Sequence, residues 1–228
     1  MSEQVLENLR KDSFLQRLVV KKKFWLFFVF LFFAYPLIRS FYRTLPAPLP
    51  VLGTVPTFNF TNEKNQPFGS ENLKGKVYLA SFFFLNCPST CPKILKTVQT
   101  IQRRVRGLGG NFMLVSFTVD PEHDIPEKLQ KRAHELQAAS HVWSFLTSDK
   151  ASMQSLLVDG FKVPMGEKSM ESLYDIAHTQ KLVLVDSKGH IRGYYGIETD
   201  DINKLMIDVG LLVNREYFEK NNKEKDHG

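Results

Sequence analysis

From residue 76 onward, short apolar runs alternate with segments in which apolar side chains recur at helical spacing. The pattern predicts β-strands at 76–85, 111–119, 142–146, 181–186 and 190–195. It predicts helices at 92–108, 127–139, 149–158 and 200–213. In the first helix the apolar side chains recur every three or four residues from Ile94 to Leu108. Ser187-Lys188-Gly189 lies between the last two strands and predicts a β-hairpin.

The order of strand, helix, strand and helix, followed by a hairpin and a final helix, indicates an α/β domain with a mixed sheet. We assign residues 55–213 to this domain. The spacing of its elements resembles the thioredoxin fold, in which the chemistry lies where the first core strand is followed by the first helix. Residues 86–92, Asn-Cys-Pro-Ser-Thr-Cys-Pro, occupy that place in this chain.

An apolar segment near the N-terminus predicts a single transmembrane anchor over residues 24–42. No charge occurs from Phe24 to Ile38, and Lys21, Lys22 and Lys23 stand directly before this run. By the positive-inside rule, residues 1–23 would stay in the cytoplasm. A cleaved signal peptide is the main alternative, but no small-x-small cleavage site follows the segment. A buried soluble helix is the other alternative, although the segment has no polar face.

The segments on either side of the domain are read as a linker and a tail. Residues 43–54 contain Pro46, Pro48 and Pro50, which favour an extended stalk between the anchor and the domain. Residues 214–228 are charged, and we expect this tail to fray.

Charge and cysteine content exclude several classes of protein. The net charge is +6 at pH 7, but eight Lys or Arg and only three acids lie in residues 1–45, so the remainder is nearly neutral. A nearly neutral domain has no basic stripe to neutralise phosphates, so we expect no nucleic-acid partner. The chain has two cysteines, which is too few for a four-cysteine zinc site.

Cys87 and Cys91 are the candidate functional residues, and each is followed directly by proline. At the start of a helix, unpaired N–H groups and the helix dipole favour a thiolate. Two thiolates at this spacing can bind one metal ion or form a disulfide. The alternative interpretation is that the two cysteines are small, inert core residues. A pair of cysteines at a strand–helix junction favours this interpretation less than a functional one.

A metal ion would need a further ligand, and copper suits two thiolates and an imidazole. His178 is the leading candidate among six histidines, because it precedes the strand 181–186 and would face the cysteine loop in a thioredoxin-like layout. His123, in the loop 120–126, is a weaker candidate. In the same loop, Asp120 and Asp124 could shape the site or cap the following helix.

Across nearly the whole domain the sequence resembles the Sco/SenC copper chaperones of cytochrome c oxidase assembly. The matching segments are Leu73 to Val77, the CxxxCP motif at 87–92, the DPxxDxP loop at 120–126, the strand around Trp143 to Thr147, and His178 with the hairpin after it. The resemblance implies copper, as Cu(I) or Cu(II), bound by Cys87, Cys91 and His178. Family members commonly carry aspartate before the histidine; here it is Ala177, which could change the tuning of the imidazole.

The resemblance also implies partners and a location. The recipient would be the copper-binding subunit of cytochrome c oxidase, and an upstream protein could donate the copper. The domain would be periplasmic, anchored in a bacterial inner membrane; Glu3 and Glu7 fit a mitochondrial presequence badly. Such a chaperone is not an enzyme. The rival hypotheses are a thiol–disulfide oxidoreductase using Cys87 and Cys91, which includes a reductase of the oxidase's own cysteines, and, less favoured, a peroxidase.

Overall fold

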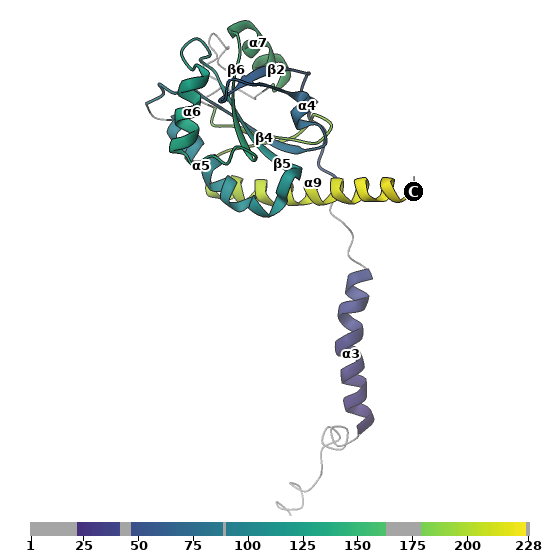
Figure 1. Cartoon of the computed structure of the whole chain (residues 1–228). Coiled ribbons are helices and arrows are strands. Elements are labelled where there is room, and N and C mark those ends of the chain that lie inside the picture. Colours follow the sequence, from purple (N-terminus) through teal and green to yellow (C-terminus); the bar gives the residue numbers. More distant parts are fainter. Residues whose placement is uncertain (1–21, 42–46, 89, 163–178, 227–228) are drawn as a thin grey trace, which may run out of the picture. The chain divides into compact units, whose positions relative to one another are not determined.

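The structure is a computed structural model, and it describes residues 22–41, 47–88, 90–162 and 179–226. The chain divides into two compact units, Met1–Ala47 and Pro48–Gly228. Figure 1 shows the elements of both units.

The described part of the first unit is one helix, α3 (Lys22–Phe41), which contains Pro36. Large apolar side chains are exposed along the helix. The first of them, Trp25, is 58% exposed and the last, Ile38, is 56% exposed. The predicted helix therefore forms. Within the described residues, however, no helix has the length and apolar character needed to cross a membrane, so the predicted anchor is not confirmed.

The second unit is built on one eight-stranded sheet with the strand order β1-β8-β7-β4-β5-β6-β2-β3. The strands are β1 (Gly53–Thr54), β2 (Asn59–Asn62), β3 (Pro67–Gly69), β4 (Val77–Phe83), β5 (Phe112–Thr118), β6 (Trp143–Thr147), β7 (Leu182–Val185) and β8 (His190–Tyr195). The sheet is mixed, because β4–β5 and β5–β6 pair in parallel while the other pairs are antiparallel. All five predicted strands are confirmed.

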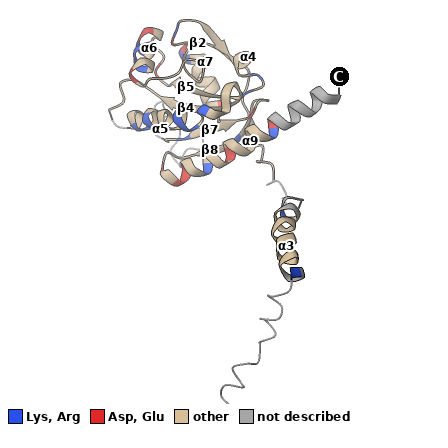
Figure 2. Cartoon of the chain, turned by 60° about the horizontal axis from the view of Figure 1, so that its bottom comes forward, with Lys and Arg blue, Asp and Glu red and all other residues tan. Residues whose placement is uncertain are grey.

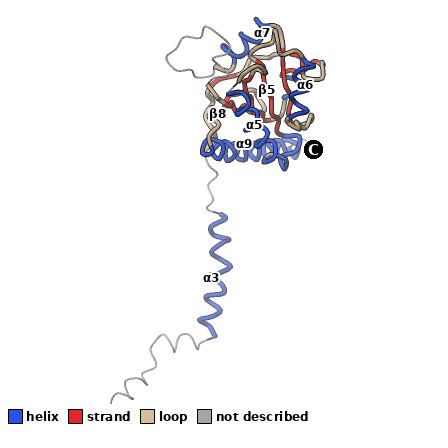
Figure 3. The backbone as a smooth tube through the Cα atoms, turned by 90° about the vertical axis from the view of Figure 1, so that its left-hand side faces the viewer, coloured by secondary structure: helices blue, strands red, loops and turns tan. Residues whose placement is uncertain are grey.

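Helices cover both faces of this sheet (Figures 1 and 3). Every residue of β4, β5, β6 and β7 is buried, as expected for central strands with two covered faces. Successive residues point to opposite faces, so Phe82 packs on Phe117 and Phe161 while Phe83 packs on Phe145. This packing fixes the end of β4, after which the cysteine loop begins.

The helices of the second unit lie largely where the sequence predicts them. They are α4 (Ser70–Leu73), α5 (Thr90–Arg104), α6 (Pro126–Glu135), α7 (Lys150–Ser155) with a π-helical turn at Leu156–Gly160, and α9 (Thr199–Asp226), and a 3-10 turn covers Arg106–Asn111. The tail was predicted to fray, and that prediction is wrong, because α9 continues to Asp226. Residues 214–226 contain neither Gly nor Pro and are rich in Glu and Lys, which favour helix.

Three short strands and α4 were not predicted. β2 pairs with β6 and with β3, so residues 59–69 extend one edge of the sheet. At the other edge β1 pairs with β8, and Leu52 N–H donates to the Ile191 carbonyl at 2.9 Å. The end of the predicted stalk 43–54 is therefore part of the sheet rather than a spacer.

Candidate metal centre

Cys87 and Cys91 lie between the end of β4 and the first turn of α5. Cys87 is in the connecting loop, and Cys91 is the second residue of the helix. Both side chains are buried, at 5% and 1% exposure, and neither forms a disulfide. The fold thus brings the two sulfur atoms together inside the domain, at the strand–helix junction where the sequence predicts the chemistry.

Backbone N–H groups are directed at both sulfur atoms. The Cys91 N–H donates to the Cys87 Sγ at 3.3 Å, and the Phe84 N–H donates to the Cys91 Sγ at 3.4 Å. Such donors stabilise negative charge on sulfur, which is the form that binds a metal. The Cys91 N–H to Cys87 Sγ hydrogen bond also holds the two cysteines next to each other. One metal ion could therefore bind both sulfur atoms, or a disulfide could join them.

Burial opposes the thiolate at Cys91. Desolvation raises the pKa of the Cys91 thiol to about 12, and the Phe84 N–H only partly offsets this effect. Cys91 therefore holds its proton at neutral pH until a metal ion or another partner displaces it.

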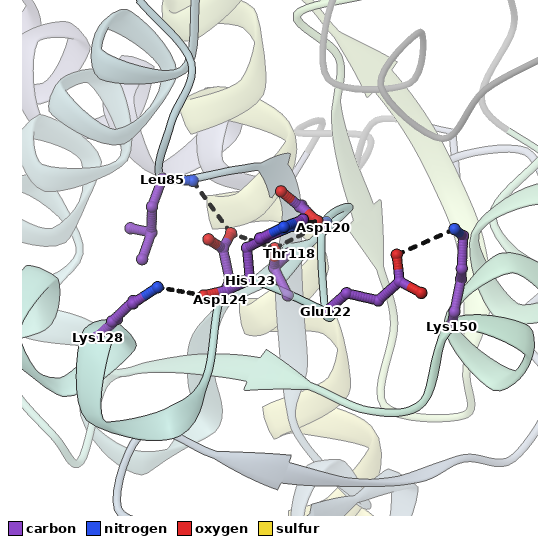
Figure 4. A network of polar contacts seen from close by, with 8 residues as sticks. All are labelled: Leu85, Thr118, Asp120, Glu122, His123, Asp124, Lys128 and Lys150. Atoms are coloured by element: carbon purple, nitrogen blue, oxygen red, sulfur yellow. Dashed lines mark hydrogen bonds and ion pairs between the residues drawn. The ribbon is translucent and has the colours of Figure 1, made fainter.

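The loop 120–126 is tied to the cysteine loop through Asp124 (Figure 4). The Asp124 Oδ2 accepts hydrogen bonds from the Leu85 N–H at 3.0 Å and from the Thr118 hydroxyl at 2.5 Å. Thr118 in turn accepts from the Asp120 N–H at 3.0 Å. A single buried carboxylate thus fixes the backbone two residues before Cys87.

Asp124 is 1% exposed, and its Oδ1 has no hydrogen-bond partner among the described residues. Burial raises the pKa of this carboxyl group, while the Thr118 and Leu85 hydrogen bonds lower it in part. The alternative role predicted for Asp120 and Asp124, capping the next helix, is wrong. The N-cap of α6 is Ile125, and no side chain caps that helix.

His123 lies at the surface of the same loop. Its Nδ1 is 2.8 Å from the Asp120 Oδ1, and the His123 side chain is 62% exposed. The hydrogen bond to Asp120 raises the pKa of the imidazole. His123 is therefore paired with a carboxylate, and no contact in the described residues joins it to the cysteines.

The third predicted ligand, His178, lies outside the described residues. Within the parts of the chain that the structure describes, no group of three His, Cys, Asp or Glu side chains could hold a metal ion. The structure thus brings together two of the three predicted ligands. It adds Leu85 and Thr118, which contact the predicted site residue Asp124 and with it position the cysteine loop.

A mixed sheet with a cysteine pair at the junction of a core strand and its helix defines a thioredoxin-like protein with a CxxxC site. More narrowly, the chain belongs to the SCO1/SenC family, whose profile matches residues 50–210. It is 29% identical over 162 residues to the SCO1 protein homolog of Bacillus subtilis (strain 168), covering 70% of this chain and 83% of that protein.

Solved structures show the same fold. BsSco, a member of the Sco family of cytochrome c oxidase assembly proteins, is 26% identical with a TM-score of 0.61, covering 73% of this chain and 98% of that one. ScoI of Bradyrhizobium japonicum, solved with copper bound, is 19% identical with a TM-score of 0.56, covering 70% and 99%.

Proposed function

We propose that this protein is a copper chaperone that delivers copper to the binuclear copper centre of cytochrome c oxidase. The observation that carries the proposal is the buried cysteine pair, in which each sulfur accepts a hydrogen bond from a backbone N–H. Membership of the SCO1/SenC family supports it, as does the role in oxidase assembly stated for BsSco.

In this proposal Cys87, Cys91 and His178 bind one copper ion. Thiolates suit Cu(I), and an imidazole helps to accommodate Cu(II). Three protein ligands leave room for a ligand of the recipient, so copper can pass from one protein to the other. Copper is cargo here, and no covalent step on a substrate is required. An upstream copper donor would load the site by the same kind of exchange.

The proposal includes attachment to a bacterial inner membrane through residues 24–42, with residues 1–23 in the cytoplasm and the domain in the periplasm. Its support is the charge-free run Phe24 to Ile38 behind three lysines, and the exposure of its large side chains in α3. Protease added to intact spheroplasts should digest the domain, and urea or high salt should not extract the chain from membranes. Digestion only after lysis would contradict this topology.

A second candidate function is a thiol–disulfide oxidoreductase that prepares the oxidase's cysteines for copper. The hydrogen bond from the Cys91 N–H to the Cys87 Sγ favours it, because this contact holds the two cysteines next to each other. The dithiol would become a disulfide as the partner's disulfide becomes a dithiol, so two electrons and two protons are transferred.

A copper titration of the reduced full-length chain in nonionic detergent separates the two candidates. We expect one copper per chain for both Cu(I) and Cu(II), loss of both in Cys87→Ser, and Cu(II) binding weakened at least about tenfold in His178→Ala. His141→Ala, an exposed histidine in a turn, is the matched control and should bind as the wild type does. Absence of copper binding, together with a Cys87/Cys91 dithiol that readily reduces a partner disulfide and becomes a disulfide itself, would favour the oxidoreductase.

A further inference from the structure

A groove with a volume of about 380 Å³ runs between α5 and the start of α9. Helix α5 contributes Lys93, Lys96, Thr97, Thr100 and Arg104 to its lining, and the α9 side contributes Ile197, Thr199, Ile202 and Asn203. The two helices lie side by side in Figures 1 and 3, and Arg104 bonds Asn203 across the groove at 3.4 Å. Three cations and no acid line this groove.

The positive charge is concentrated on one face of α5. The helix carries four cations, Lys93, Lys96, Arg103 and Arg104, and no acidic residue. The residues of α5 that line the groove recur at spacings of three and four, so they share one exposed face, whereas Cys91 is on the buried side. Figure 2 shows basic residues along α5. The chain outside residues 1–45 is nearly neutral, so this face is a local excess of positive charge. The expectation that the domain has no basic stripe, drawn from its net charge, is wrong at this helix.

Helix stability accounts for Arg104, which lies in the last turn of α5, but not for Lys93 and Lys96. Lys93 lies in the first turn of α5, where the helix dipole disfavours positive charge, and Lys96 lies three residues further on the same face. Among the ion pairs of the described residues, none involves Lys93, Lys96 or Arg104. Asp200 and Asp201, in the first turn of α9, do not line the groove. The charge is thus available to a partner.

We infer that this groove is the docking surface for an acidic patch on the protein with which the cysteine pair exchanges copper; the inference rests on the proposed function. Lys93 is only two residues beyond Cys91, so a partner bound along α5 would have its own site beside the cysteines. Because Cys87 and Cys91 are 5% and 1% exposed, exchange requires a partner held closely in place. Complementary charge supplies both fast association and this orientation.

The test is the association rate of the full-length chain, in nonionic detergent, with the soluble copper-site domain of the oxidase subunit from the same organism. The groove variant is the triple substitution Lys93→Gln, Lys96→Gln and Arg104→Gln. The control is Lys64→Gln, Lys131→Gln and Lys188→Gln, which removes three exposed cations from other elements. At low salt we expect association to be slower by about tenfold or more in the groove variant only. The wild-type rate should also fall with added salt, and the groove variant should lose most of this dependence.

Equal rates for the two triple variants would overturn the inference. So would equally tight, salt-dependent binding of a single-stranded oligonucleotide that the groove variant loses, because the groove would then be a general polyanion site. Copper titration of the same samples keeps the two proposals separate. If the wild-type protein binds copper but its association rate does not depend on salt, the docking inference is overturned and the chaperone function is not. If association depends on the charge of the groove but the protein binds no copper, the chaperone function is overturned and the docking inference is not.

Discussion

At the scale of single residues, Cys91 would set the conditions under which the proposed copper site is loaded. Its thiol is held neutral by burial, with a pKa of about 12, while the Phe84 N–H is directed at its sulfur. A metal ion must therefore displace the Cys91 proton in order to bind, and the backbone donor is in place to stabilise the thiolate that results.

Copper affinity should accordingly rise with pH. Cys91 remains protonated throughout pH 6–8 in the metal-free protein, so its proton alone gives about a tenfold increase in Cu(I) affinity per pH unit. Competition with a chromophoric Cu(I) chelator across this range measures the slope. Cys91→Ser should bind more weakly, with a shallower slope. A wild-type affinity that does not change with pH would show that Cys91 is not a ligand.

Asp124 gives a second residue-level prediction, for stability. Folding raises the pKa of Asp124 above its ordinary value of 3.8, so the favourable contribution of this group to stability is complete below pH 3.8 and is lost as pH rises through the folded pKa. Asp124→Asn removes this titration, so its free energy of unfolding relative to wild type should increase as pH rises above 3.8. Urea unfolding at several pH values measures the difference. Glu127→Gln, an exposed carboxylate on α6, is the control and should show no such trend.

Sequence reasoning located part of this site and could not locate the rest. The two cysteines are found because strand pattern, proline positions and spacing all agree at residues 86–92. The Leu85–Asp124 hydrogen bond joins residues 39 positions apart, and the DPxxDxP loop was the only signal for it. That signal suggested either a site role or a helix cap, and only the fold shows that Ile125 takes the cap position.

At the scale of elements, the predicted strands are those that are central and apolar, and the missed strands are edges. β4 and β5 are recognisable because every position is buried. β1, β2 and β3 are two to four residues long, and β2 and β3 read Asn-Phe-Thr-Asn and Pro-Phe-Gly, compositions typical of loops. They are strands only because a neighbouring strand lies beside them, which is tertiary information.

Gly69 shows how closely this edge is packed. A Cβ atom at Gly69 would collide with the Phe58 carbonyl oxygen and lie 2.9 Å from the Asn59 Cα, so the backbone of β2 would have to move. We expect Gly69→Ala to lower the free energy of unfolding by about 1–3 kcal/mol in urea denaturation. Gly107→Ala is the matched control, because a Cβ there meets nothing within 4 Å and should change stability by less than about 0.5 kcal/mol. Equal effects of the two substitutions would contradict the packing argument.

At the scale of the whole molecule, residues 49–55, at the start of the second unit, form hydrogen bonds with the rest of that unit at several positions. Arg192 Nη1 donates to the Leu49 carbonyl at 2.7 Å, while its Nε donates to the buried Asp186 at 2.8 Å. The Leu52 and Val55 N–H groups each donate to the β7–β8 hairpin at 2.9 Å. The domain therefore begins near Pro48, before the boundary at residue 55 that the sequence pattern predicts.

Two truncations that differ by eight residues test where the folded unit begins. Deletion of residues 1–47 leaves β1 and the Leu49 contact in place, so the free energy of unfolding should stay within about 0.5 kcal/mol of the full-length chain in detergent. Deletion of residues 1–55 removes β1 and exposes the edge of β8, which should lower stability by about 2 kcal/mol or more and promote aggregation. Urea unfolding and light scattering measure the two effects. Equal stability of the two truncated chains would show that β1 is dispensable and would move the start of the domain to residue 56.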